Sequence, residues 1–360
     1  MAHANGGDRF ADGSDLCLAD DATIRAGIIG YGGAFNMGRH HAGAINGQPG
    51  MRTVAICDLD PRRQEAAKAD FLDVDTYGDY REMLSRDDID LCVVVLPHNL
   101  HGQVAVACSE AGKHVITEKP MCITVAEATA MIEAGRRTGR MVTVFHNRRH
   151  DADYRTVRRI VRQGLIGDVY HVEMFWGGYG HPGHWWRSDR QVSGGHAYDW
   201  GAHILDWLLG VVPSRITDVR GVARKMKWMD VTNEDHVQMD IFFDNGVTAD
   251  VQMSSVARIG RPRWRVLGTL GALEHAGDHC RVETEVGGVA TSMRFGFQGD
   301  GGDYYKQLAD HLLRGGPLDV KPEQARRVIA IIEAAGRSSQ SGRPEPVAHE
   351  ETVDPSDRWN

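Results

Sequence analysis

Two polar side chains of the sequence have the types and the spacing that proton transfer at a hydroxyl requires. His203 follows Asp199 by four positions in the segment Gly194–Gly210, which we predict to be one helix, so the two side chains would share a face. Histidine is the usual acceptor of a hydroxyl proton near neutral pH, and Asp199 could orient the ring or bind a substrate hydroxyl. A packed structural histidine is the alternative, so this pair alone does not establish an active site.

Lys119 is a third candidate. It belongs to the run Glu118-Lys119-Pro120, which follows the apolar stretch His114–Thr117, and we predict that stretch to be a strand of a parallel sheet. Ligands of such sheets bind at the carboxyl ends of the strands, and Pro120 fixes the turn there. A lysine in this place can donate to a substrate oxygen; without further context, a surface lysine is the alternative.

A glycine turn predicts a dinucleotide. Gly30 and Gly32 follow the predicted strand Ile24–Ile29 and precede a predicted helix. Gly30 permits the tight turn, and Gly32 lets the backbone approach a pyrophosphate, which the N–H groups of the helix start would bind. The usual third glycine is displaced because residues 33–38 resemble a short insertion, so an ordinary strand–helix turn remains an alternative.

Asp58 indicates which dinucleotide would bind. It ends the second predicted strand, Thr53–Asp58, 28 positions after Gly30. A carboxylate there can bind both ribose hydroxyls and repels a 2′-phosphate, which favours NAD over NADP. Arg62 and Arg63 lie nearby in the sequence and could still serve NADP.

Residues 176–187, here called the aromatic loop, read Trp-Gly-Gly-Tyr-Gly-His-Pro-Gly-His-Trp-Trp-Arg. Aromatic faces stack on sugar C–H faces, and Arg and His bind hydroxyls. We therefore expect substrate contacts from four of its residues: Trp176, Tyr179, His181 and Arg187. A packing loop or a subunit contact is the alternative.

A metal site is a further possibility on the predicted helix. His196, Asp199, His203 and Asp206 follow one another at steps of three, four and three, and two histidines with a carboxylate can bind zinc. Lys119 would crowd a cation, and hydride transfer to nicotinamide needs no metal. We therefore expect no metal, and we expect Asp206 to anchor the helix within its domain.

Two predicted domains position these residues. From residue 22 to 146, short apolar runs alternate with amphipathic segments, which predicts an α/β Rossmann domain with a parallel, doubly wound sheet. From 147 to 360, half-exposed strands and the turn Asp244-Asn245-Gly246 predict an α+β domain with a large, mostly antiparallel open sheet for substrate binding and oligomerisation. Residues 1–21 are predicted to be a disordered tail, without the apolar core of a signal peptide.

Composition limits the partners. The 360 residues carry a formal net charge of −8, with 42% hydrophobic and 25% charged residues, as is ordinary for a globular protein. Nothing favours binding to nucleic acid or to a membrane. None of the six cysteines forms a CxxC pair, so we expect a reducing, cytoplasmic environment.

In this order, these motifs resemble the Gfo/Idh/MocA oxidoreductases, the family of glucose–fructose oxidoreductase and inositol dehydrogenase. The resemblance is carried by the glycine turn, Asp58, the run Leu96-Pro97-His98-Asn99-Leu100-His101, the run Ala111-Gly112-Lys113-His114-Val115 followed by Glu118-Lys119-Pro120, and the GGHAYDWGAHILD segment. It covers about residues 24 to 345. It implies a homodimer or homotetramer formed through the exposed face of the C-terminal sheet.

The resemblance also implies site residues. Cofactor contacts are implied at Gly30, Gly32, Asp58, Leu96, Pro97, His98, His101, Glu118, Lys119 and Asn147, with Phe35, Asn36 and Met37 in the longer glycine loop. Lys119 matches the family's catalytic lysine, and Asp199 and His203 match residues that line its substrate pocket.

The expected activity is therefore an NAD-dependent oxidation of a CH–OH group of a sugar, polyol or cyclitol, or the reverse reduction. His203 would be the general acid/base, Lys119 would polarise the C–O group, and Asp199 would position them. One alternative is a glycosidase or lyase with a tightly bound, internally recycled NAD. A second alternative is a non-enzymatic protein that senses NAD or sugar.

Overall fold

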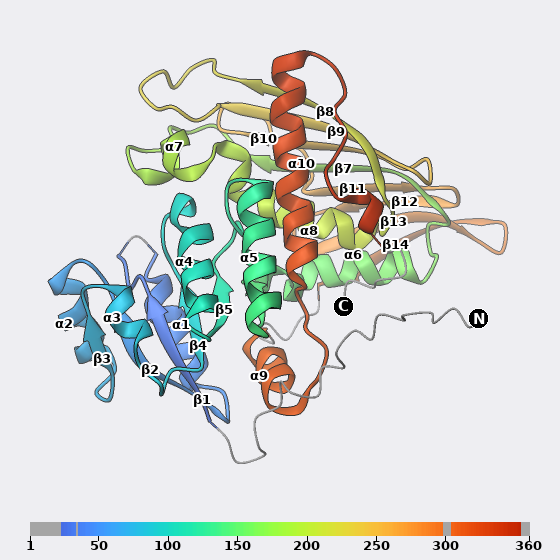
Figure 1. Cartoon of the computed structure of the whole chain (residues 1–360). Helices are drawn as coiled ribbons and strands as arrows, with labels where there is room; N and C mark the ends of the chain where they lie inside the picture. The colour runs from blue at the N-terminus through green and yellow to red at the C-terminus, as the bar shows by residue number, and fades with distance from the viewer. Residues whose placement is uncertain (1–22, 34, 298–303, 354–360) are drawn as a thin grey trace, which may run out of the picture.

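A computed structural model of the chain describes residues 23–33, 35–297 and 304–353, and it shows two sheets with their helices (Figure 1). The predicted N-terminal tail, residues 1–21, lies outside the described residues, as does Ala34 of the glycine loop. In the described part of the chain, no helix is long and apolar enough to cross a membrane.

The N-terminal sheet is parallel and has six strands in the order β3-β2-β1-β4-β5-β6. Its strands are β1 (Ile24–Ile29), β2 (Met51–Cys57), β3 (Asp75–Tyr77), β4 (Leu91–Val94), β5 (His114–Thr117) and β6 (Val142–Val144). All residues of β4 and β5 are buried, as strands covered on both faces should be. The chain order reverses between β1 and β4, and ligands bind at such a switch point.

Helices connect these strands, and some of them begin at clear local capping signals. They are α1 (Met37–Asn46), α2 (Pro61–Asp70), α3 (Tyr80–Leu84), α4 (His98–Glu110) and α5 (Val125–Thr138). Pro61 occupies the first turn of α2, and the Asp60 side chain accepts from the Arg62 N–H. Thr124 and Glu127 form a reciprocal capping box at the start of α5.

The C-terminal sheet has eight strands in the order β14-β13-β12-β11-β7-β10-β9-β8. They are β7 (Val169–Gly177), β8 (Ile216–Arg224), β9 (His236–Phe243), β10 (Thr248–Ser254), β11 (Trp264–Gly268), β12 (Gly271–His275), β13 (His279–Val286) and β14 (Val289–Gly296). The pair β7–β10 is parallel, and the other pairs are antiparallel. The predicted turn at Asp244-Asn245-Gly246 joins β9 to β10, with Gly246 at φ +85°.

The helical layer of this half lies on one face of the sheet and reaches the first domain (Figure 1). It comprises η2 (Asn147–His150), α6 (Ala152–Arg162), η3 (Trp186–Ser188), α7 (Arg190–Ser193), η4 (His196–Tyr198), α8 (Trp200–Val211), α9 (Tyr304–Arg314), α10 (Pro322–Ser341) and η5 (Glu350–Thr352). Glu333 of α10 accepts from the Val125 N–H at 2.9 Å, and Tyr304 of α9 donates to the Val144 carbonyl at 3.1 Å. These contacts bind the end of the chain to the Rossmann domain.

The predicted helix Gly194–Gly210 is wrong in its first part. Gly194 and Gly195 both have positive φ, +87° and +132°, which ends α7 and interrupts the helix. A short 3-10 turn follows, and α8 begins at Trp200 with Asp199 as its N-cap residue. Three strands, β3, β8 and β14, were not predicted. In β14 the half-buried side chains of Thr291, Met293 and Phe295 alternate with exposed ones, but none of its side chains is fully buried.

Candidate functional site

A cavity of about 770 Å³ lies at the carboxyl edge of the parallel sheet, within the size range of cofactor sites. Its lining comes from the segments that follow β1, β2, β3, β4 and β5, together with η3 of the C-terminal domain. Most of the cofactor residues predicted from the sequence line it: Gly30, Gly32, Phe35, Asn36, Met37, Asp58, Leu96, Pro97, His98, Glu118 and Lys119.

The glycine turn is required by close backbone packing. Gly30 has φ +97°, and a Cβ there would collide with the carbonyl oxygen of Val95. The displaced third glycine is Gly38, on the first turn of α1, where a Cβ would lie 2.6 Å from the Gly30 carbonyl oxygen. The insertion therefore lengthens the loop, while the close contact between the helix start and the strand end is kept. Such a turn fits a pyrophosphate at the N-terminus of α1.

Asp58 supports the turn as well as facing the cavity. Its Oδ2 accepts from the backbone N–H groups of Tyr31 and Gly32, at 2.9 and 2.8 Å, and its Oδ1 accepts from the Asp60 N–H. The carboxylate is thus fixed at the end of β2, beside the glycine loop, where a ribose diol of a dinucleotide would bind.

Three arginines surround this end of the cavity. Arg62 is paired with Asp60 at 2.8 Å, whereas the Arg63 guanidinium lies over Gly33, where a Cβ would collide with it. Arg81 lines the cavity, with its guanidinium carbon 4.7 Å from the centroid of the Tyr80 ring. Arg63 and Arg81 are therefore the cations that could bind a 2′-phosphate at this end of the cavity.

Three strands away from β2 and Asp58, two cations of the cavity lining share one carboxylate that is not itself part of the lining. Lys119 Nζ donates to Asp199 Oδ1 at 2.6 Å and to the Asp199 carbonyl at 3.1 Å, and Arg187 donates to the same Oδ1 at 2.8 Å. Although burial opposes ionisation, the charges of Lys119 and Arg187 lower the pKa of Asp199 to about 2. The structure therefore brings together two of the three predicted catalytic residues, and Arg187 with them.

His203 is buried on α8, with its ring edge-on to Trp200 and to His146 at centroid distances of 5.5 and 5.9 Å. Burial and then the charge of Lys119 lower the pKa of His203 well below its ordinary value. Its Nδ1 is buried without a hydrogen-bond partner in the described structure. The ring is therefore neutral at pH 7, the form that accepts a proton, but it does not itself line the cavity.

His98 is a second neutral imidazole and does line the cavity. Its Nδ1 lies 2.8 Å from the Ser193 carbonyl oxygen, which can only accept, so Nδ1 carries the proton. Burial and the neighbouring His101 lower the pKa of His98 to about 3. Its Nε2 is buried without a partner among the described residues, and it can accept a hydrogen bond from a ligand.

Two predicted cofactor residues lie outside the lining. His101 is fully buried, and its ring nitrogens each lie 2.8 Å from a carbonyl oxygen, one of Pro120 and one of Leu96. It thus ties the loop after β4 to the turn that carries Lys119. Asn147 is half-buried at the start of η2.

The aromatic loop divides between the cavity and the C-terminal domain. Arg187 lines the cavity, as does Trp186. Trp176 stacks on Trp200 at a centroid distance of 3.5 Å, and Tyr179 packs against Arg258 at 3.7 Å from its ring centroid. His181 pairs with Asp230 at 3.0 Å. Trp176, Tyr179 and His181 thus lie outside the cavity lining.

The four residues weighed above as a metal site do not lie on one helix. The glycine pair Gly194-Gly195 places His196 on η4 and Asp199 at the N-cap of α8. Asp206 instead accepts two hydrogen bonds from Arg149, at 2.9 and 2.6 Å, and both side chains are fully buried. Arg149 also donates to the Asp319 carbonyl, so Asp206 anchors α8 in its domain, as expected.

A buried series of hydrogen bonds behind Glu118 was not predicted from the sequence. The hydroxyl of Tyr305 lies 2.5 Å from His41 Nδ1, and His41 Nε2 lies 3.0 Å from Glu118 Oε1. Glu118 Oε2 accepts from the Lys119 N–H. Burial acts to raise the pKa of Glu118, but the bond from His41 and the nearby charges lower it overall. No local signal could have linked residues 264 positions apart.

Both halves of the chain match models of one family. Residues 24–146 match the NAD-binding Rossmann fold of the Gfo/Idh/MocA oxidoreductase family, and residues 154–274 match its C-terminal domain. The scyllo-inositol 2-dehydrogenase (NADP(+)) IolW of Bacillus subtilis is 26% identical over 367 residues, which cover 91% of this chain and 97% of that protein.

Two further similarities agree with these matches. The inositol 2-dehydrogenase of Salmonella typhimurium is 33% identical over 153 residues, 42% of this chain and 45% of that protein. The crystal structure of an NAD-binding protein from Listeria innocua superposes with a TM-score of 0.81 at 25% identity, over 91% of this chain and 98% of that one. The chain belongs to the Gfo/Idh/MocA family of oxidoreductases.

Proposed function

We propose that this protein is an NAD-dependent dehydrogenase that oxidises a hydroxyl of a sugar, polyol or cyclitol, or catalyses the reverse reduction. The observation that carries the proposal is the set of Lys119, Asp199 and Arg187, which meets three strands away from β2 and Asp58. A dinucleotide whose ribose binds at Asp58 has its reactive ring at the other end of such a cavity. The inositol dehydrogenases among the relatives support the substrate class.

The residues of the cavity fit the cofactor. Gly30 permits the tight turn, and Gly32 has open space where a Cβ would lie, which lets the backbone approach a phosphate. The carboxylate of Asp58 supports NAD, because it would repel a 2′-phosphate. The NADP named for the Bacillus relative, and Arg63 and Arg81, make NADP the competing cofactor to be tested beside it.

When bound, the nicotinamide supplies the hydride acceptor. Lys119 then donates to the oxygen of the reacting C–O group and stabilises the charge that develops on it. Asp199 holds the ammonium group in place, and Arg187 holds Asp199. His203, which is neutral at pH 7 and lies behind the cavity lining, is the proposed acceptor of the hydroxyl proton. His98 does line the cavity, and its free Nε2 accepts a hydrogen bond from a ligand there.

Reduced-nicotinamide absorbance with purified protein tests the proposal, using NAD or NADP and a panel of sugars, inositols and anhydrosugars. We expect turnover with one class of compounds in this panel. Lys119→Met, which keeps the length of the side chain without its charge, should lower kcat by about 10²–10³ while cofactor binding persists. Turnover that Lys119→Met leaves unchanged would refute the assigned site.

Two other results would redirect the assignment. Aglycone release without net NADH, with cofactor retained through gel filtration, would indicate a glycosidase or lyase that recycles its NAD. Sugar binding without turnover, unaffected by Lys119→Met, would indicate a sensor. We further propose that a dimer or tetramer forms through the exposed face of the C-terminal sheet, which sedimentation can test.

A further inference from the structure

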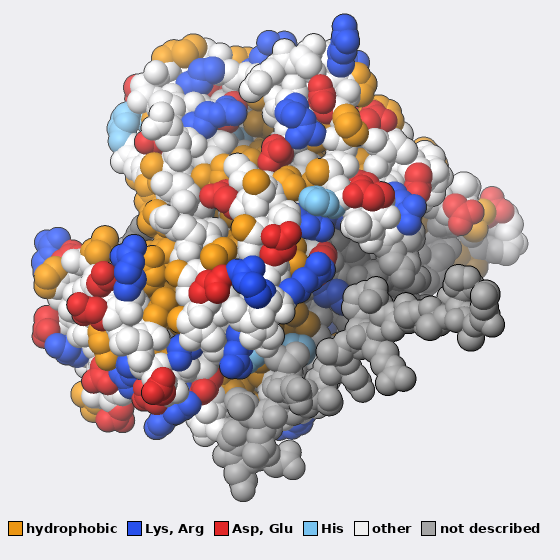
Figure 2. All heavy atoms as spheres, in the orientation of Figure 1, with side chains coloured by type: hydrophobic (Ala, Val, Ile, Leu, Met, Phe, Trp, Pro, Cys, Tyr) orange, Lys and Arg blue, Asp and Glu red, His pale blue; other side chains and the backbone are white. Residues whose placement is uncertain are grey.

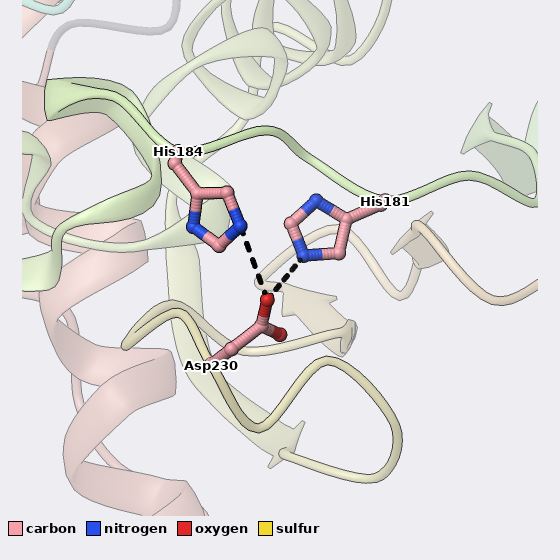
Figure 3. A group of neighbouring side chains, drawn as sticks. All are labelled: His181, His184 and Asp230. Atoms are coloured by element: carbon pink, nitrogen blue, oxygen red, sulfur yellow. Dashed lines mark hydrogen bonds and ion pairs between the residues drawn. The ribbon is translucent and has the colours of Figure 1, made fainter.

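A second group of chemistry-bearing side chains lies outside the cavity, where the aromatic loop meets the loop between β8 and β9. Figure 3 shows the imidazoles of His181 and His184 directed at one carboxylate oxygen of Asp230. We propose that these three residues bind a divalent transition-metal ion, with zinc the best match. The proposal is independent of the dehydrogenase reaction.

The donor atoms are spaced as zinc ligands are. His181 Nε2 and His184 Nε2 lie 3.0 and 3.3 Å from Asp230 Oδ2. Ligands about 2.1 Å from a tetrahedral zinc are about 3.4 Å apart, so the two nitrogen–oxygen distances need to change by only a few tenths of an ångström, and all three donor atoms already lie within 4.8 Å of one another. Two imidazoles and one carboxylate are a donor set that favours zinc over magnesium or calcium.

The two loops are already held in place around this group. The Gly180 N–H donates to the Ser255 carbonyl, Trp185 Nε1 donates to the Pro182 carbonyl, and Ser188 Oγ donates to the Gly183 carbonyl. The His181 ring packs edge-on against Trp228 at a centroid distance of 5.1 Å. Little ordering is therefore required when the metal binds, which favours affinity.

The ion must compete with one existing hydrogen bond and one proton. His181 Nδ1 accepts from the Gly183 N–H at 2.9 Å, so its Nε2 carries the proton in this conformation. Metal binding at Nε2 requires the other tautomer, in which Nδ1 carries the proton and no longer accepts from the Gly183 N–H, so the metal–ligand bonds must offset the loss of that hydrogen bond. The side chains of His181, His184 and Asp230 are 29%, 70% and 54% exposed, which leaves the fourth position open to water.

The proposed metal site lies close in the chain to a residue of the cavity lining. His184 lies three residues before Arg187, and the backbone of Arg187 already binds the Asn233 side chain from the same β8–β9 loop. An ion between the two loops would add a second connection there. It would restrict the motion of Arg187, which holds Asp199.

The test is a calorimetric titration of the full-length, chelator-treated protein with zinc chloride. The same titration with magnesium chloride is the comparison. We expect one equivalent of zinc with a dissociation constant of about micromolar, and no magnesium binding at that concentration. Cobalt(II) should quench tryptophan fluorescence, because His181 contacts Trp228. His184→Ala and Asp230→Asn should each weaken zinc at least about tenfold.

His279→Ala is the matched control, because His279 also pairs with an aspartate, Asp278 at 2.9 Å, without belonging to the three-ligand group. It should leave zinc binding unchanged. His184 is largely exposed, so its replacement leaves the fold intact, which circular dichroism verifies. The proposal would be overturned if the wild type showed no saturable zinc binding. It would also be overturned if His184→Ala and Asp230→Asn bound zinc as tightly as the wild type does.

Discussion

Replacing Asp199 with asparagine tests the core of the proposed site. The change keeps the shape of the side chain and removes the charge that both Lys119 and Arg187 contact through Oδ1. The two cations would then face each other without their shared counter-ion, because an amide oxygen can still accept from Lys119 but carries no negative charge. We expect lower turnover and a measurable loss of stability, and the structure sets the size of both.

The stability term follows from the pKa of Asp199, about 2 against an ordinary value of 3.8. One pKa unit corresponds to about 1.4 kcal/mol, and because a third of the side chain is exposed, screening reduces the gain to about 1–2 kcal/mol. A carboxyl whose pKa is depressed by folding stabilises above its unfolded pKa, and this contribution is lost as pH falls toward 2. The cost of Asp199→Asn should therefore be full at pH 7 and shrink at pH 3.

The kinetic term follows from geometry. A reacting group displaced by about 1 Å can cost about 10²-fold in rate, and we expect a kcat decrease of this order with little change in the dissociation constant of NAD. Urea unfolding at pH 7 and pH 3 measures the first term, and steady-state kinetics with the substrate found in the panel measures the second.

Asp90→Asn is the matched control for Asp199→Asn. Asp90 also binds an arginine, Arg25, through its side chain and backbone, but at the opposite end of β1 from the cavity. It should lower stability and leave kcat unchanged. The reasoning is refuted if Asp199→Asn keeps kcat within about twofold of wild type, or if its stability cost is as large at pH 3 as at pH 7.

Three further results are expected. His203→Ala should lower kcat by about 10²–10⁴ without weakening the binding of NAD. Because burial and Lys119 hold the pKa of His203 below 6.5, the acidic limb of the wild-type pH profile of kcat should also lie below pH 6.5. An acidic limb above that value would contradict the assignment. Asp58→Ala should weaken NAD and narrow its preference over NADP, measured as a ratio of dissociation constants; an unchanged ratio would mean that Asp58 does not select the cofactor. Asp206→Asn removes the carboxylate that accepts two hydrogen bonds from the buried Arg149 and should cost about 3–5 kcal/mol in urea unfolding, so a loss below about 1 kcal/mol would contradict an anchoring role for this pair.

The surface of the molecule agrees with the expectation from its composition. On the face shown in Figure 2, Lys and Arg side chains are interspersed with Asp and Glu across the described residues. The charge there is not segregated into a basic stripe of the kind that binds nucleic acid. Net charge is a property of composition, whereas its distribution depends on which side chains the fold brings to one face.

Local features of the site could be predicted from the sequence because their causes are local. Gly30 marks a turn where the fold allows no Cβ, Pro61 starts a helix, and Lys119 follows a short, fully buried strand. The start of α8 could not be predicted from periodicity, because Gly194 and Gly195 adopt positive φ and break the helical pattern. Gly38 could be recognised as the third glycine of the turn only after the helix start had been placed against β1.

The sequence by itself was enough to predict the two-domain architecture and the glycine turn. It also indicated Lys119, Asp199 and His203 as candidate catalytic residues. Hydrophobic periodicity, glycine stereochemistry and short motifs are written in consecutive residues, so they can be read without contacts. Only the tertiary structure decided that Asp199 is shared by Lys119 and Arg187, that His41 and Tyr305 support Glu118, and that His181 meets Asp230, 49 positions away. Those pairings depend on strand order and on loop packing, which bring together side chains that no local pattern connects.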